Sequence, residues 1–148
     1  RQYEVSAWCL PGFECRHNLN YWSFGDYLGI GAGAHGKLTG PDGTITRYAK
    51  RRQPRDYMAC EANALTAETR VLDREDILGE FMLNALRLNR GFTLDAFTAR
   101  TGLEAEALEP QLGEFCLQGL LERDDRGVRA TAQGRRYLDS VVAEFFTG

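Results

Sequence analysis

Cysteine spacing of the kind that holds a zinc ion or an iron–sulfur cluster is missing from this sequence. Such sites need closely spaced thiolates that place several ligands on one ion or cluster. The chain contains no C-x-x-C or C-x-x-x-C-x-x-C arrangement, and its four cysteines are scattered: Cys9, Cys15, Cys60 and Cys116. This argues against a metal site built from the chain alone. Scattered thiols in 148 residues are typical of a reduced, cytoplasmic protein rather than a disulfide scaffold.

Long apolar runs and an excess of one charge are missing as well. No apolar stretch approaches the roughly 20 residues that a membrane span needs, so we expect a soluble chain without stable membrane insertion. The formal net charge of −3 gives no general attraction to nucleic acid or to an anionic membrane. The chain opens on Arg1-Gln2-Tyr3 with neither an initiator Met nor a signal-peptide pattern, so we expect a piece of a longer protein.

The first third of the chain has the patterns of strands and loops. We expect a strand at residues 3–8, a loop at 15–22 and a second, unusually glycine-rich strand at 26–35. The tetrapeptide at residues 40–43, Gly-Pro-Asp-Gly, predicts the turn of a β-hairpin. From about Pro54 the pattern becomes helical.

The remaining residues predict a helical unit with a small β-wing. Apolar residues recur at helical spacing from Ile77 to Leu88, and Gly91 stops that helix. Two further helices are expected at 94–100, after a Thr93 cap, and at 104–118, with a kink or a later start at Pro110. Asp124–Gly127 should form the turn between two short strands, and a closing helix should follow a Thr131 cap. Three helices, a wing and a closing helix make a winged-helix-like unit.

A winged-helix outline is typical of DNA-binding proteins, but this one has the wrong charge. Residues 104–118, where a recognition helix would lie, carry four glutamates and neither Lys nor Arg. Phosphate contacts supply most of the nonspecific affinity for DNA, so an acidic helix would be repelled. We therefore expect no nucleic-acid partner, and expect the helical unit to cover a barrel mouth or to dock an acceptor protein.

Alternating glycines at residues 28–36 form the most unusual stretch of the sequence. In a strand, Gly29, Gly31 and Gly33 would share one face with His35, leaving bare backbone beside an imidazole. Because glycine weakens a strand, this alternation indicates that a flat ligand or another segment approaches the backbone closely. A tight bend or close packing without a ligand is the alternative. A dinucleotide fingerprint also matches here, but no helix is expected to follow it, which disfavours that site.

An imidazole, two amides and two large aromatic rings gather within residues 17–22, His-Asn-Leu-Asn-Tyr-Trp. This set pairs an iron ligand with planar aromatic surface, as a porphyrin pocket requires. The alternative is a hydrogen-bonded structural histidine.

Four segments together resemble one family, and the resemblance covers nearly the whole chain. They occur in the order found in the haem-chaperone (HemW-type) branch of the radical-SAM HemN family, whose other branch is oxygen-independent coproporphyrinogen III oxidase. The segments are Tyr3-Glu4-Val5-Ser6, His17-Asn18-x-x-Tyr21-Trp22, Asp26-Tyr27-x-Gly29-x-Gly31-x-Gly33-Ala34-His35-Gly36 and Phe81-Met82-Leu83-Asn84-Ala85-Leu86-Arg87-Leu88.

The resemblance implies an α+β fold in three parts. Residues 1–40 would be the terminal strands of a radical-SAM partial (β/α) barrel, and residues 41–70 a hairpin and connecting segment. Residues 71–148 would form the winged-helix-like helical HemN C-terminal domain. Strand edges left without their barrel neighbours would also favour association, for instance as a homodimer.

The resemblance further implies the ligands. Haem would be bound by His17, Asn18, Tyr21 and Trp22, with His17 as the iron ligand. The full-length protein would hold S-adenosyl-L-methionine and a four-iron four-sulfur cluster whose cysteine ligands this chain lacks. Contacts to the S-adenosylmethionine region would come from Gly29, Gly31, Gly33, Ala34 and His35, although His35 departs from the aliphatic residue of the oxidase branch.

The implied function is that of the C-terminal part of a haem chaperone, which binds haem or a porphyrin and delivers it to acceptor proteins. Without the cluster motif, the chain alone should be catalytically inactive. The alternative is part of an oxygen-independent coproporphyrinogen III oxidase of porphyrin biosynthesis. A basic segment could pair with porphyrin propionates or simply form a solvated face: Arg47, Lys50, Arg51, Arg52 and Arg55.

Overall fold

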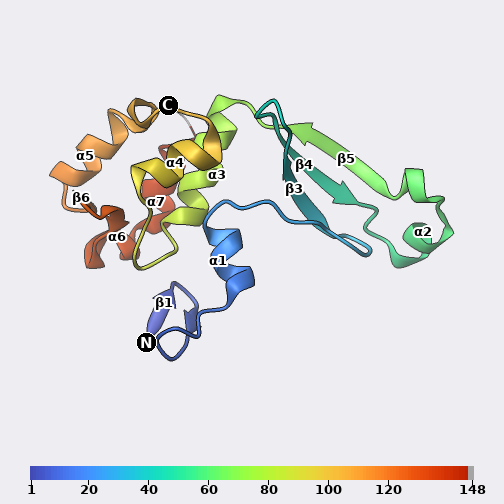
Figure 1. Ribbon diagram of the computed structural model, residues 1–148, viewed down its shortest axis with the longest axis horizontal. Coiled ribbons are helices and arrows are strands. Elements are labelled where there is room, and N and C mark those ends of the chain that lie inside the picture. Colours follow the sequence, from blue (N-terminus) through green and yellow to red (C-terminus); the bar gives the residue numbers. More distant parts are fainter. Residues whose placement is uncertain (147–148) are drawn as a thin grey trace. The chain divides into compact units, whose positions relative to one another are not determined.

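The computed structural model describes residues 1–146 and divides into two compact units (Figure 1). The first unit joins residues 1–24 to the segment that begins at Arg74, and the second consists of residues 25–73. These bounds differ from the three-part division at 40/41 and 70/71, and the assignment of residues 1–40 to the end of a barrel stays a prediction. Within residues 1–146, no helix is long and apolar enough to cross a membrane.

The first unit starts with a hairpin rather than the single predicted strand. Strands β1 (Gln2–Glu4) and β2 (Ala7–Trp8) pair antiparallel. The chain turns between them because the Glu4 carboxylate accepts hydrogen bonds from both the backbone N–H and the hydroxyl of Ser6, at 3.0 and 2.9 Å. The prediction of one strand over 3–8 was therefore wrong: a local side-chain bond ends the extended run.

The predicted loop at residues 15–22 was also wrong, because Arg16–Trp22 is helix α1. Its first turn is closed by the Leu19 N–H, which donates to the Cys15 carbonyl at 2.9 Å. Seven residues are too few to be stable as an isolated helix, so contacts with the rest of the unit must hold α1 in place.

The helical part of this unit follows the sequence prediction closely. The Thr93 and Thr131 hydroxyls accept hydrogen bonds from the N–H groups of Ala96 and Gly134 at 3.1 and 3.0 Å, as the predicted caps require. Two bounds differ: the first helix ends at Ala85, and the closing helix is interrupted at Tyr137. The elements are α3 (Arg74–Ala85), α4 (Leu94–Thr101), η2 (Ala105–Leu108), α5 (Gln111–Leu117), β6 (Leu121–Asp124), β7 (Gly127–Ala130), α6 (Ala132–Arg136) and α7 (Leu138–Ala143).

An aromatic cluster forms the centre of the core of this unit. The Phe81 ring, which is only 1% exposed, meets three other rings edge to face. Its centroid lies 5.8 Å from that of Phe24, 4.9 Å from Phe92 and 5.0 Å from Phe97. The cluster therefore joins Phe24, two positions after the end of α1, to α3, α4 and the loop between α3 and α4.

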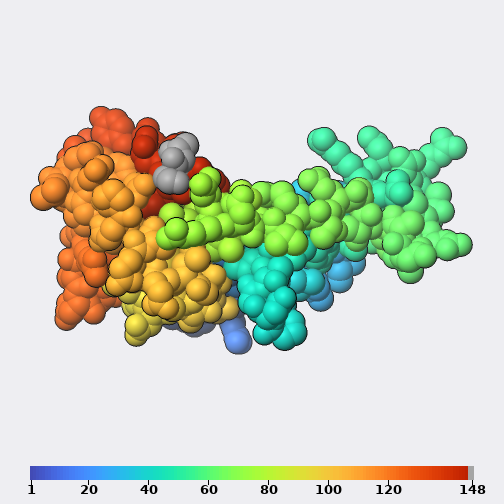
Figure 2. Space-filling view, turned by 90° about the horizontal axis from the view of Figure 1, so that it is seen from above, coloured from blue at the N-terminus to red at the C-terminus, as the bar shows by residue number. Residues whose placement is uncertain are grey.

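The second unit is a three-stranded antiparallel sheet in the order β3-β4-β5, with β4 in the middle (Figure 1). The predicted hairpin is confirmed, since the Gly40 N–H donates to the Thr44 carbonyl at 2.8 Å between β3 and β4. The strands and helices are β3 (His35–Thr39), β4 (Ile45–Lys50), α2 (Pro54–Ala59), η1 (Ala62–Ala64) and β5 (Thr66–Val71). A sequence pattern did not reveal β5, because both of its faces are largely exposed and carry no apolar alternation. Figure 2 shows one side of this segment at the surface.

An ion pair between a buried lysine and a partly exposed carboxylate ties the start of the second unit to β3. The Lys37 side chain is 1% exposed, and its ammonium donates to the Asp26 carboxylate at 2.7 Å. The backbone N–H and the hydroxyl of Thr39 donate to the same carboxylate at 2.8 and 2.9 Å. Partial burial by itself would raise the pKa of Asp26, but the bonds from Lys37 and Thr39 outweigh it and hold that pKa below its usual value.

The lowered pKa of Asp26 predicts a dependence of stability on pH. A carboxyl with a depressed folded-state pKa contributes stability above its unfolded pKa of about 3.9, and this contribution is lost as pH falls through the folded pKa. At pH 7, Asp26→Asn should lower the free energy of unfolding by about 2 kcal/mol; the partly exposed carboxylate keeps the effect below that of a fully buried pair. The difference between the variant and the wild type should therefore be smaller at pH 3 than at pH 7, and it should vanish once the pH lies below the folded-state pKa of Asp26.

Urea titrations at pH 7 and pH 3, followed by the amide NMR signals of β3 and β4, measure this. Glu68→Gln, on the exposed face of β5, is the control and should change neither titration. An equal loss of stability for Asp26→Asn at both pH values would refute the assignment to ionised Asp26.

Candidate functional site

Helix α1 presents the predicted haem-binding residues on two different faces. Residues four apart share a face of a helix, so His17 lies with Tyr21 and Asn18 lies with Trp22. His17 is exposed, and its ring centroid is 6.3 Å from that of Tyr21. Asn18 and Trp22 are half-buried. Tyr21 is half-buried too, and its ring meets that of Trp22 edge to face with the centroids 5.1 Å apart. Of the four residues, His17 is therefore the one whose side chain is open to a ligand.

The inner face of α1 is fixed by two contacts. The Asn18 amide donates to the Tyr3 hydroxyl at 3.1 Å. The Arg87 guanidinium stacks over the Trp22 ring, with its carbon 4.3 Å from the ring centroid. Asn18 and Trp22 therefore join α1 to β1 and to the segment that follows α3.

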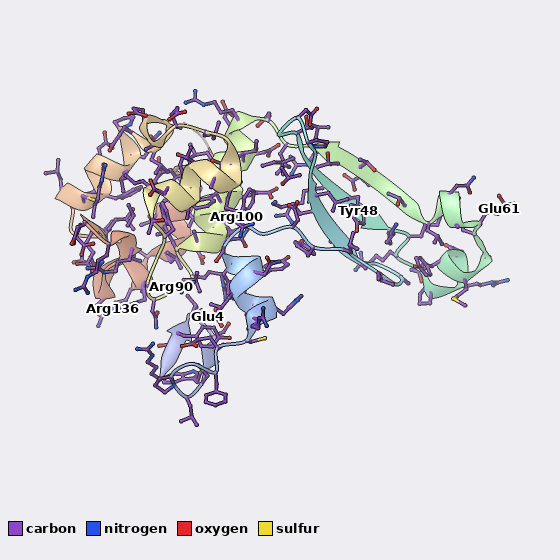
Figure 3. All side chains as sticks on the ribbon, in the orientation of Figure 1. Glu4, Tyr48, Glu61, Arg90, Arg100 and Arg136 are labelled. Carbon is purple, nitrogen blue, oxygen red and sulfur yellow. The ribbon has the colours of Figure 1, made fainter. Side chains whose placement is uncertain are left out.

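Arg87 in turn neutralises a buried carboxylate. The Glu4 side chain is only 2% exposed and lies 3.3 Å from an Arg87 nitrogen, which also donates to the Ser6 hydroxyl at 3.0 Å. The Arg87 carbonyl accepts from the Val5 N–H at 3.0 Å. Three of the four motif segments, around residues 4, 18–22 and 87, thus contact one another and form one cluster. The sequence did not predict this cluster. Figure 3 labels Glu4, which belongs to it.

A cavity of about 700 Å³ opens in the same unit. Trp22, Phe81 and Phe92 give it an aromatic lining, and arginine side chains supply its charge. Figure 3 labels two of these arginines, Arg90 and Arg100. Sequence reasoning missed them because they lie on separate elements, and only the fold collects them: Arg90, Arg100, Arg126 and Arg129.

The glycine-rich stretch of the second unit is a loop, which corrects the predicted strand at 26–35. Gly31 and Gly33 have φ angles of 104° and 71°, in the left-handed region that excludes an extended strand and favours glycine. A Cβ at Gly36 would overlap the Tyr48 ring, so Tyr48, labelled in Figure 3, is the segment that approaches the backbone. The side-chain-free wall expected on one strand face is therefore absent from this stretch.

The amide groups of this loop are already bonded within the unit. The Gly29 N–H donates to the Tyr48 hydroxyl at 2.8 Å, and the Gly31 N–H donates to the Tyr57 hydroxyl at 3.3 Å. The Gly33 N–H donates to the Arg51 carbonyl at 2.8 Å. A Cβ at Gly31 would meet open space, so no neighbouring atom covers this side of the Gly31 backbone.

His35 is the first residue of β3 rather than the end of a glycine strand, and it pairs with Ala49 of β4. It is exposed. His35 and Ala34, like the glycines before them, belong to the second unit, whereas His17 belongs to the first. Among residues 1–146, no three His, Cys, Asp or Glu side chains gather closely enough to hold a metal ion.

The basic segment 47–55 is partly engaged by neutral groups. Arg47 donates to the Tyr27 hydroxyl at 2.6 Å, Lys50 to the Thr66 hydroxyl at 2.9 Å, and Arg51 to the Ala64 carbonyl at 2.8 Å. These bonds brace the sheet and its connection. They give three of the five basic residues a structural role.

Comparison with known proteins shows what the helical segment is similar to. Residues 72–137 match the model of the HemN C-terminal domain. Over 145 residues, 98% of this chain, the sequence is 43% identical to the heme chaperone HemW of Escherichia coli (strain K12), of which it covers 38%. It is 38% identical over 147 residues, 99% of this chain, to the heme chaperone HemW of Haemophilus influenzae, again covering 38% of that protein. The chain thus spans well under half the length of these relatives.

A solved structure agrees at the level of the fold. It is described as "Coproporphyrinogen III oxidase (HemN) from Escherichia coli is a Radical SAM enzyme", and the match has a TM-score of 0.53 and 20% sequence identity. The match covers 83% of this chain and 29% of that one. The mixed helix-and-sheet fold is therefore similar to that of HemN. The family-model match and the HemW relatives confirm the resemblance predicted from the motifs.

Proposed function

We propose that this chain, with its HemN C-terminal domain at residues 72–137 and its HemW-like sequence throughout, is the C-terminal part of a longer radical-SAM protein that binds haem and delivers it to acceptor proteins. The observation that carries this proposal is the 43% identity, over 98% of the chain, to a protein named heme chaperone HemW. Haem is the cargo in this proposal.

Helix α1 would receive the haem. His17 is exposed and offers an imidazole nitrogen as an iron ligand, and the Tyr21 ring beside it offers aromatic surface to the macrocycle. Asn18 and Trp22 belong to the same proposed site, but their contacts with Tyr3 and Arg87 indicate that they position the helix. The motif would then combine a ligand face with an anchoring face.

The radical chemistry of the full-length protein would be supplied outside this chain. The four cysteines do not fit a cluster, because their spacing is irregular and no metal-binding group of three forms within residues 1–146. We therefore expect the chain alone to be catalytically inactive. For S-adenosylmethionine we retain the loop at 29–35 as the proposed contact, with Gly31 as its open position and His35 at its end.

The finer fold assignment belongs to the same proposal. In the longer protein, residues 1–40 would complete a radical-SAM partial barrel, and the helices with the β6–β7 hairpin would form a winged-helix-like domain. The TM-score of 0.53 with HemN and the order of three α-helices, hairpin and closing helices support this.

Loss of the His17 imidazole should weaken haem binding. In the full-length protein, His17→Ala is expected to lower haem affinity by about tenfold or more and to shift the Soret band, because a direct iron bond is lost. Cluster content should stay unchanged. The measurement is a spectroscopic haem titration, with iron and sulfide analysis alongside.

Arg16→Gln is the matched control, since Arg16 is the exposed neighbour of His17 on α1 and should leave the titration unchanged. An unaltered Soret band and affinity in His17→Ala would remove His17 from the ligand role. Transfer of haem from the loaded protein to an apo-haem protein tests delivery.

A second candidate function is oxidative decarboxylation of coproporphyrinogen III, which the HemN-like fold favours. The full-length protein, reduced and supplied with S-adenosylmethionine without oxygen, would then form protoporphyrinogen. Product formation would favour this candidate, and haem binding without product would favour the chaperone.

A further inference from the structure

The cavity of the first unit has one sign of charge. Four guanidinium groups line it, and its lining includes no Asp or Glu side chain. The chain as a whole carries a net charge of −3, so the positive charge of the cavity lining is opposite in sign to the net charge of the chain. A cavity of this kind attracts anions.

Most of this charge is not neutralised by the protein. Arg129 is paired with Glu122 and Asp124 at 2.7 and 2.9 Å, so it contributes little net charge. The side chains of Arg90, Arg100 and Arg126 are exposed. Within residues 1–146 these three side chains make no hydrogen bond or ion pair.

The remaining lining combines apolar side chains with the polar residues Ser23, Asn89 and Thr93. Accessible ring surface comes chiefly from the half-buried Trp22, because Phe81 and Phe92 are only 1% and 8% exposed. The volume of about 700 Å³ lies within the usual range for small-molecule sites. Guanidinium groups bind carboxylates through two parallel hydrogen bonds, and ring surfaces favour a planar ligand. The complementary ligand is therefore a flat aromatic molecule with carboxylate groups.

We infer that this cavity binds the carboxylate side of a tetrapyrrole, with Arg90 and Arg100 pairing with its propionates. The inference rests on the proposed function, which supplies the tetrapyrrole. It adds a site on other elements: Arg90 precedes α4 and Arg100 lies in its last turn. Trp22 links the two sites, since it ends α1 and also lines the cavity.

Recognition of carboxylates is separate from ligation of iron. His17 is not among the residues that line the cavity. The cavity should therefore bind a porphyrin whether or not it contains a metal, whereas His17 should matter only for the iron form.

Titrations of the full-length protein with metal-free protoporphyrin IX and with its dimethyl ester, followed by porphyrin fluorescence, test the inference. The wild type should bind the free acid about tenfold or more tightly than the ester, because esterification removes both charges. The double variant Arg90→Gln/Arg100→Gln should lose this preference by binding the acid as weakly as the ester. Raising the salt concentration should weaken only acid binding to the wild type.

Arg136→Gln is the control, because Arg136 is an exposed arginine of the same unit that does not line the cavity (Figure 3). Its preference for the acid should match that of the wild type. Thermal unfolding of each variant should be unchanged, since Arg90 and Arg100 have no partners to lose.

Equal binding of acid and ester by the wild type, no binding of the acid, or an unchanged preference in the double variant would overturn the inference. His17→Ala separates this result from the proposed function. That variant should bind the metal-free acid normally while losing affinity for haem. If instead it binds haem normally while the arginine variant fails, the iron ligand is wrong and the cavity assignment stands.

Discussion

Replacing Phe81 with alanine is expected to lower the free energy of unfolding of the first unit by about 4 kcal/mol. The ring is 1% exposed and meets Phe24, Phe92 and Phe97 edge to face at centroid distances of 4.9 to 5.8 Å. Truncation removes the transfer free energy of the ring, the ring–ring contacts and the packing around them, and leaves a void that four elements cannot close.

Urea unfolding monitored by the amide NMR signals of α3 and α4 measures this loss. Leu83→Ala supplies the control from the same helix, because Leu83 is 44% exposed and its truncation should cost less than about 1 kcal/mol. A loss below about 2 kcal/mol for Phe81→Ala would contradict a core centred on this ring.

Arg87→Ala should lower the free energy of unfolding by about 3 kcal/mol, the second largest effect. The substitution leaves the Glu4 carboxylate, only 2% exposed, without its cationic partner. It also removes the guanidinium stacked over Trp22, a contact of about 1 kcal/mol. Most of the loss comes from the Glu4 carboxylate, because a buried charge that has lost its cationic partner keeps its full desolvation penalty.

A double-mutant cycle with Glu4→Gln separates the two contributions. In the Glu4→Gln background, Arg87→Ala should cost about 1 kcal/mol, which corresponds to the lost stacking on Trp22. The free energies come from urea titrations of the four proteins. Additive effects of the two substitutions would show that Glu4 and Arg87 are not energetically coupled.

The parts of the fold that depend on local chemistry were predictable. Thr93 and Thr131 each accept a hydrogen bond from the residue three positions on, and Gly102 ends its helix at a φ of 71°. Caps and turns bring together residues that are near in sequence, so a short pattern identifies them. The turn at 40–43 and the later start of α5 after Pro110 follow the same rule.

The parts that depend on distant partners were not predictable. Residues 16–22 form a helix because Asn18 bonds to Tyr3 and Trp22 stacks under Arg87, a partner 65 positions away. The glycines at 29–33 form a loop because the Tyr48 and Tyr57 hydroxyls accept hydrogen bonds from the N–H groups of Gly29 and Gly31. The Tyr48 ring also packs on Gly36 in β3. In both cases the residue pattern is present, but the conformation that it adopts depends on contacts with side chains that are distant in the sequence.

The sequence by itself determined the family resemblance, the capped helices with their β-wing, and the absence of cluster-binding cysteine spacing. Each is carried by residue types at short, fixed separations. The tertiary structure decided that His17 and Trp22 lie on different faces of one helix, that Glu4 and Arg87 neutralise each other, and that four arginines share a cavity. These features require contacts between residues that are up to about a hundred positions apart in the sequence. Only packing of the core around Phe81 brings such distant segments close enough for their side chains to touch.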